Sequence, residues 1–129
     1  MNYNTNQSIF IQIADRICDR VLSGEYQAEA RIPSVRELAL EMEVNPNTVM
    51  RSYERLQANE IIYNKRGIGY FISPDAEKEI RRMRHNQFID EVLPAVFKEM
   101  HLLGVELKEL TNAYDQYSST LNTGNHEKK

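Results

Sequence analysis

The chain has 129 residues, of which 41% are hydrophobic and 27% are charged, a composition typical of an ordinary soluble protein. Its length suits one small domain, or one small domain with an appendage. No apolar run approaches the roughly 18 residues that a membrane-spanning helix needs, and the polar stretch 1–7 lacks the layout of a secretory signal. The single cysteine, Cys18, excludes an internal disulfide. We therefore expect a cytoplasmic protein with no membrane association.

The net charge of −3 is not what a nucleic-acid-binding protein usually carries. The two halves of the chain do not differ enough to help, because residues 1–73 carry 8 Lys/Arg against 9 Asp/Glu and residues 74–129 carry 8 against 10. Any DNA-binding surface must therefore be local, built by placing a few cations on one face.

The first predicted helix spans residues 8–22, because isoleucine and valine recur every four positions from Ile9 to Val21. Gly24 follows as the expected helix end. The polar stretch 25–33 closes with a proline and predicts a loop.

Two helix-start signals follow close together. Ser34 and Glu37 have the spacing of a capping box, in which the hydroxyl accepts from an amide and the carboxylate reaches back. Asn45 can cap a second helix with Pro46 at its first position, and the apolar spacing carries this helix to about Asn59. Because the link between the helices is short, we expect them to cross at a steep angle.

Two β-type runs, 61–64 and 70–72, flank the glycine-bearing segment 65–69 and predict a hairpin with a cationic tip. The order helix, helix, short turn, helix, hairpin is that of a winged helix-turn-helix. The predicted fold class is therefore α+β, mostly α, with a winged helix-turn-helix in residues 1–73.

Residues 74–121 are predicted to be helical and to serve dimerisation, with residues 122–129 disordered. Pro94 should bend or restart the helix, and Gly104 should separate a long helix from a shorter one. An apolar stripe with alternating spacings of four and three is too long for so small a winged unit to cover, so we expect it to pair with a second copy. The predicted dimerisation residues are Ile89, Leu93, Val96, Met100, Leu103, Leu107, Leu110 and Tyr114.

In a helix-turn-helix the second helix of the pair enters the major groove. Its outward side here would carry Asn47, Arg51, Glu54 and Arg55, and amide and guanidinium groups make paired contacts with adenine and guanine. Arg36 in the preceding helix and the cations at the hairpin tip would contact phosphates, which gives salt-dependent affinity rather than sequence choice.

These segments resemble a known family. The string RIPSVRELA at 31–39 is similar to the R-L-P-S-x-R-E-L-A signature of the GntR family of bacterial transcription regulators. Segments 44–49 and 53–56 resemble its recognition helix and 65–72 its wing, so the resemblance covers about residues 8–73. The short helical remainder resembles the YtrA subfamily, whose tail mainly serves dimerisation and whose members are often repressors near transporter operons.

The resemblance implies a sequence-specific regulator, a repressor of a nearby operon, that binds a palindromic DNA operator as a homodimer. The predicted DNA-binding residues are Arg31, Ser34, Arg36, Asn45, Asn47, Thr48, Arg51, Arg55, Lys65, Arg66 and Gly67.

The chain departs from the family pattern at two places. Relatives often have Pro-Gly-Asp where this chain has Ala28-Glu29-Ala30, and many have Ser-Arg where it has Asn45-Pro46. The first departure predicts a different loop conformation. The second removes an arginine that could reach a phosphate, so the operator cannot be copied from relatives.

The alternative function is a winged-helix module for protein interaction without DNA binding, which the acidic net charge permits. A small-molecule effector stays open. The three histidines show no metal-ligand spacing, and no nucleophile–base pair or phosphate loop occurs, so we expect no metal, no cofactor and no enzyme activity.

Overall fold

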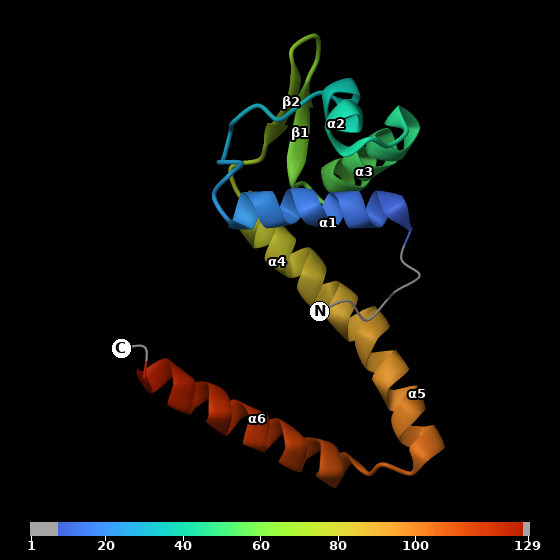
Figure 1. Cartoon of the computed structure of the whole chain (residues 1–129), viewed down its shortest axis with the longest axis vertical. Helices are drawn as coiled ribbons and strands as arrows, with labels where there is room; N and C mark the ends of the chain where they lie inside the picture. Colours follow the sequence, from blue (N-terminus) through green and yellow to red (C-terminus); the bar gives the residue numbers. More distant parts are fainter. Residues whose placement is uncertain (1–7, 128–129) are drawn as a thin grey trace. The chain divides into compact units, whose positions relative to one another are not determined.

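The structure, a computed structural model, describes residues 8–127, with side chains described for residues 8–122. Its contacts divide the chain into two units, the first ending at Gln87 and the second starting at Phe88. The first unit contains α1 (Ile9–Leu22), α2 (Val35–Met42), α3 (Pro46–Ala58), β1 (Ile62–Lys65), β2 (Gly69–Ile72) and α4 (Ala76–Gln87) (Figure 1). The second contains the π-helical segment η1 (Phe88–Val92), α5 (Leu93–Leu103) and α6 (Leu107–Glu127).

Helix α2 begins at the predicted capping box. The Ser34 hydroxyl accepts from the Glu37 amide at 3.1 Å, and the Ser34 amide donates to the Glu37 carboxylate at 2.8 Å. The bond from the Ser34 amide to the carboxylate lowers the pKa of Glu37, and the nearby Ser34 hydroxyl lowers it further by a smaller amount. The start of α2 is therefore fixed by local chemistry, as predicted.

The link between α2 and α3 consists of residues 43–45. Glu43 ends α2 in the left-handed conformation, with φ 56°, and the Val44 amide donates to the Ala39 carbonyl at 3.0 Å, a pattern that closes helix ends. The side-chain oxygen of Asn45 then accepts from the Asn47 amide at 2.8 Å, with Pro46 in the first turn of α3. The predicted helix pair is confirmed.

The hairpin is antiparallel and pairs Ile62 with Ile72 and Lys65 with Gly69. A third extended segment runs along β2, because the Ile32 amide donates to the Tyr70 carbonyl and the Ile72 amide to the Ala30 carbonyl, each at 3.0 Å. In Figure 1 the hairpin and the α2–α3 pair lie on the same side of α1, and within the first unit the hairpin turn lies furthest from α1. Mostly helical with a small sheet, the first unit is the predicted winged helix-turn-helix.

The core of the first unit extends past residue 73, where the sequence placed the domain boundary. Helix α4 contributes Ala76, Ile80 and Met83 to the same buried cluster as α1 and α3. Arg84 of α4 also donates to a carboxylate oxygen of Asp19 at 2.9 Å. The structure differs from the prediction because contacts such as Arg84–Asp19 join residues 65 positions apart, which no local pattern reveals.

Cys18 lies in this core, fully buried between neighbouring helices. Burial raises the pKa of its thiol to about 12, against the opposing effect of the Arg84 and Arg55 charges. A thiol with so high a pKa stays protonated at physiological pH, so Cys18 acts as a small apolar core residue.

In the second unit, helical geometry changes where Pro94 was expected to disturb it. Pro94 lacks an amide hydrogen, and the five residues of η1 immediately before α5 adopt the wider π-helical turn. Gly104 ends α5 in the left-handed conformation with φ 71°, as predicted. Helix α6 then continues to Glu127, so residues 122–127 are helical where disorder was expected, and residues 128–129 lie outside the described residues.

Candidate nucleic-acid interface

Helix α3 has one buried and one exposed side. Val49, Tyr53 and Leu56 are fully buried, which confirms the predicted apolar side. Asn47 and Arg51 lie on the exposed side, as the predicted major-groove contacts require. Thr48 is half-buried in the first turn, and its amide donates to the Asn45 carbonyl at 2.9 Å.

Arg51 is held over the ring of Phe10, with its guanidinium carbon 4.2 Å from the ring centroid. The neighbouring Ser52 donates its hydroxyl hydrogen to the Phe10 carbonyl, 2.6 Å away. Phe10 therefore positions Arg51 from another helix. The sequence placed Phe10 only in the apolar stripe of α1, and no local pattern could have paired residues so far apart.

Arg55 lies apart from Asn47 and Arg51. It is half-buried, its Nε atom is buried without a hydrogen-bond partner among the described residues, and its charge acts on the Cys18 thiol. This places Arg55 toward α1 rather than on the outermost row of α3. A role for Arg55 in DNA binding stays a prediction.

Two of the predicted DNA-binding residues act as caps. The side-chain oxygens of Ser34 and Asn45 each accept a backbone amide at a helix start. Arg36 is exposed in the first turn of α2. Pro33, which precedes this turn and its cap, is fixed by a hydrogen bond from the core, because the buried Tyr53 hydroxyl donates to the Pro33 carbonyl at 2.6 Å.

The hairpin turn carries exposed Lys65, Arg66 and Gly67. The Lys65 amine lies 4.4 Å from the centroid of the Phe71 ring, and that ring stacks on Tyr63. The stacked rings of Tyr63 and Phe71 thus hold the Lys65 amine beside the hairpin turn.

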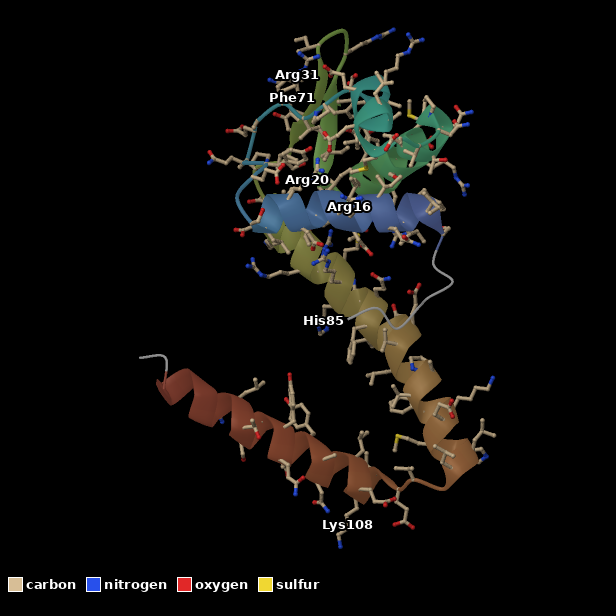
Figure 2. The ribbon with its side chains drawn as sticks, viewed as in Figure 1. Arg16, Arg20, Arg31, Phe71, His85 and Lys108 are labelled. Carbon is tan, nitrogen blue, oxygen red and sulfur yellow. The ribbon has the colours of Figure 1, made fainter. Side chains whose placement is uncertain are left out.

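Arg31 belongs to the third extended segment and pairs with Phe71 of β2, and Figure 2 shows the two residues next to each other. A Cβ atom at Gly69 would come within 2.9 Å of the Arg31 Nε atom. Glycine at this position therefore makes room for the guanidinium beside the turn. The structure brings Arg31 together with the hairpin cations.

The candidate interface consists of the exposed side of α3, the first turn of α2 and the hairpin turn with its neighbour Arg31. Its cations form no ion pair with any other residue that the structure describes; they are Arg31, Arg36, Arg51, Lys65 and Arg66. Elsewhere in the unit, four arginines do pair with carboxylates: Arg20, Arg81, Arg82 and Arg84. The interface cations are thus left available to an external anion.

Comparison with known proteins identifies the group to which this architecture belongs. The model of the family described as bacterial regulatory proteins, gntR family, matches residues 11–72. The transcriptional regulator YhcF of Bacillus subtilis is 35% identical over 108 residues, which cover 84% of this chain and 88% of YhcF. The chain belongs to the GntR family.

Two further similarities extend over most of this GntR-family chain. The transcriptional repressor YtrA of Bacillus subtilis is 33% identical over 116 residues, covering 90% of the chain and 88% of YtrA. The crystal structure of a GntR-family regulator from Bacteroides thetaiotaomicron shares 47% identity with a TM-score of 0.72, covering 88% of this chain and 99% of that one. The predicted YtrA resemblance is confirmed, and the chain is a transcription regulator of a DNA-binding, non-enzymatic class.

The second unit of this GntR regulator exposes apolar surface. None of its side chains is buried within the described residues 88–122. The predicted dimerisation residues are either exposed, namely Ile89, Leu103, Leu107 and Tyr114, or half-buried, namely Leu93, Val96, Met100 and Leu110. Helices α5 and α6 therefore leave uncovered the stripe that the sequence assigned to a partner copy.

An open cavity of about 500 Å³ lies between the end of α1, the loop that follows it and the start of α4. Its lining mixes Tyr26, Ile72 and Pro74 with Lys78 and Arg81. An effector for this GntR regulator stays a prediction. No group of three or more metal-ligating side chains occurs among the described residues, and no described helix is long and apolar enough to span a membrane.

Proposed function

We propose that this GntR regulator is a sequence-specific repressor that binds a palindromic operator as a homodimer. The observation that supports DNA binding most directly is the set of interface cations that have no ion pair within the described part of the chain, in a protein of net charge −3. A protein-interaction module would not need unpaired cations on the helix pair and the hairpin, which are the elements that contact DNA in this motif.

The proposed contacts divide into two kinds. Arg31, Arg36, Lys65 and Arg66 contact phosphates and set the register of the protein on the duplex, helped by the Ser34 hydroxyl. The exposed side of α3 reads base edges in the major groove, with Asn47 suited to adenine. The caps formed by Ser34 and Asn45 hold both helix starts in place, Gly67 offers its backbone amide, and Thr48 offers its side-chain hydroxyl.

Dimerisation is assigned to the second unit. A surface with this much exposed leucine, isoleucine and tyrosine needs a partner, and a second copy supplies an identical stripe. Two-fold symmetry then presents two α3 helices to successive major grooves, about one DNA turn apart. The operator is therefore a palindrome.

Repression follows from the same arrangement, because a dimer bound across a promoter blocks access to it. The relative YtrA is a named repressor. We propose that the target is an operon close to the regulator's own gene, and a transporter operon is the first to test.

Selection of bound duplexes from a random pool tests sequence-specific binding. We expect an enriched palindrome, and an Arg36→Ala, Arg66→Ala double variant that binds it at least 100-fold more weakly, since each charged contact contributes about 1.5–3 kcal/mol. Arg81→Ala is the matched control, because Arg81 is exposed and ion-paired with Glu77. No enriched sequence, or equal binding by the double variant, would refute the proposal.

Sedimentation equilibrium tests the dimer. A Leu103→Glu, Leu107→Glu variant should be monomeric, because it places charges within the apolar stripe. Asn112→Glu, an exposed position on the opposite side of α6, adds charge without touching the stripe and should leave the dimer intact. A wild-type monomer at micromolar concentration would contradict the assignment.

A further inference from the structure

Helix α3 carries an exposed large apolar residue beside its predicted DNA-contacting side chains. Met50 has 40% of its surface exposed and lies three residues after Asn47, so the two occupy neighbouring positions on successive turns. The other large apolar residues of α3, Val49, Tyr53 and Leu56, are fully buried. Met50 is thus not needed for the packing of α3, and its thioether is free to meet a ligand.

The two arginines of α3 leave room for Met50 in base recognition. Arg51 is held over Phe10 at the start of α1, and Arg55 is half-buried near Cys18. Both guanidinium groups are therefore drawn toward α1, away from the row that Asn47 and Met50 occupy. A row with an amide and a thioether but no guanidinium does not suit guanine, whose edge offers two acceptors.

We propose that Met50 covers the C5-methyl group of a thymine in each half-site, next to an adenine that Asn47 contacts, so that α3 reads A·T base pairs. This inference rests on the proposed DNA-binding function. In the major groove the thymine methyl is the apolar feature that distinguishes A·T from other pairs. A flexible methionine side chain adapts its shape to such a group, which a charged side chain cannot cover without losing its own hydration.

The effect of one methyl group sets the expected size of the signal. Covering a methyl is associated with about a fourfold change in affinity, equivalent to about 0.8 kcal/mol. A dimer covers one methyl in each half-site, so loss of both should weaken binding about 15-fold.

Deoxyuridine lacks this methyl and provides the test. Each symmetric pair of thymines in the selected palindrome is replaced by deoxyuridine, and the affinity is measured by fluorescence anisotropy. For the wild type, one pair of replacements should weaken binding about 15-fold. Met50→Ala should bind the thymine duplex about 15-fold more weakly than wild type and should lose nothing further on the deoxyuridine duplex.

Leu40→Ala is the matched control, because Leu40 is an exposed apolar residue of the same unit, on α2, with 81% of its surface accessible. It should discriminate the two duplexes as the wild type does. Equal wild-type affinity for every deoxyuridine duplex, a palindrome without thymine, or discrimination retained by Met50→Ala would overturn the inference while leaving DNA binding in place. Absence of any selected duplex would instead reject the proposed function, and this inference with it.

Discussion

Replacing Arg36 by alanine should change how steeply DNA affinity falls with salt. The structure leaves four proposed phosphate-contacting cations without an ion pair among the described residues: Arg31, Arg36, Lys65 and Arg66. Two protomers would neutralise eight phosphates, and about 0.9 counterion is released for each. The logarithm of the association constant should therefore fall with the logarithm of the salt concentration with a slope of about −7. Doubling the salt should cost about a hundredfold in affinity.

The Arg36→Ala dimer loses two of these contacts, so its slope should be about −5 and doubling the salt should cost only about fortyfold. Anisotropy titrations of the selected palindrome at several sodium chloride concentrations measure both slopes. Arg81→Ala should keep the wild-type slope, because its guanidinium is already paired with Glu77. A slope for Arg36→Ala that matches the wild type, or a wild-type slope near zero, would show that these cations do not meet phosphates.

Three smaller predictions concern the winged unit itself. Tyr53→Phe removes the donor to the Pro33 carbonyl and should lower the free energy of unfolding, measured in urea, by about 1–1.5 kcal/mol, whereas unchanged stability would mean that the 2.6 Å contact contributes nothing. Glu29 has φ 65°, so Glu29→Gly should raise stability by about 0.5 kcal/mol and Glu29→Ala should not, because only glycine escapes the steric cost of this conformation. Cys18, with a thiol pKa of about 12, should resist a thiol reagent at pH 8 until the protein is unfolded, and rapid labelling of the native protein would contradict its burial.

The elements that the sequence predicted well are those determined by neighbours in the chain. The capping box at Ser34 and the cap at Asn45 involve atoms two or three residues apart, so residue type and spacing were sufficient. The same holds for the turn at Gly104 and for the altered helix before Pro94. Apolar periodicity then assigned the buried side of α3 correctly, because a helix repeats its direction every 3.6 residues.

The interactions that escaped prediction join residues far apart in the chain. Helical periodicity placed both Arg51 and Arg55 on the outward side of α3. In the structure Arg51 lies over Phe10, whereas Arg55 is half-buried near Cys18. Helix position alone cannot reveal which neighbouring helix attracts a long, flexible side chain. At Glu29, by contrast, the local comparison with the family was informative. The matching family position is often glycine, and Glu29 takes the left-handed conformation that glycine adopts at little cost.

The negative net charge of the chain was evidence against DNA binding, and the structure shows why this evidence was weak. Net charge counts a paired and an unpaired arginine alike, yet only an unpaired one can replace a counterion on DNA without first losing a carboxylate partner. In the first unit, carboxylates such as Glu41 and Asp19 are occupied by Arg20 and Arg84 near α1 and α4, whereas the cations of the candidate interface have no such partner among the described residues. The distribution of ion pairs, rather than the sum of charges, is therefore the property from which to judge whether a winged helix of this family can bind DNA.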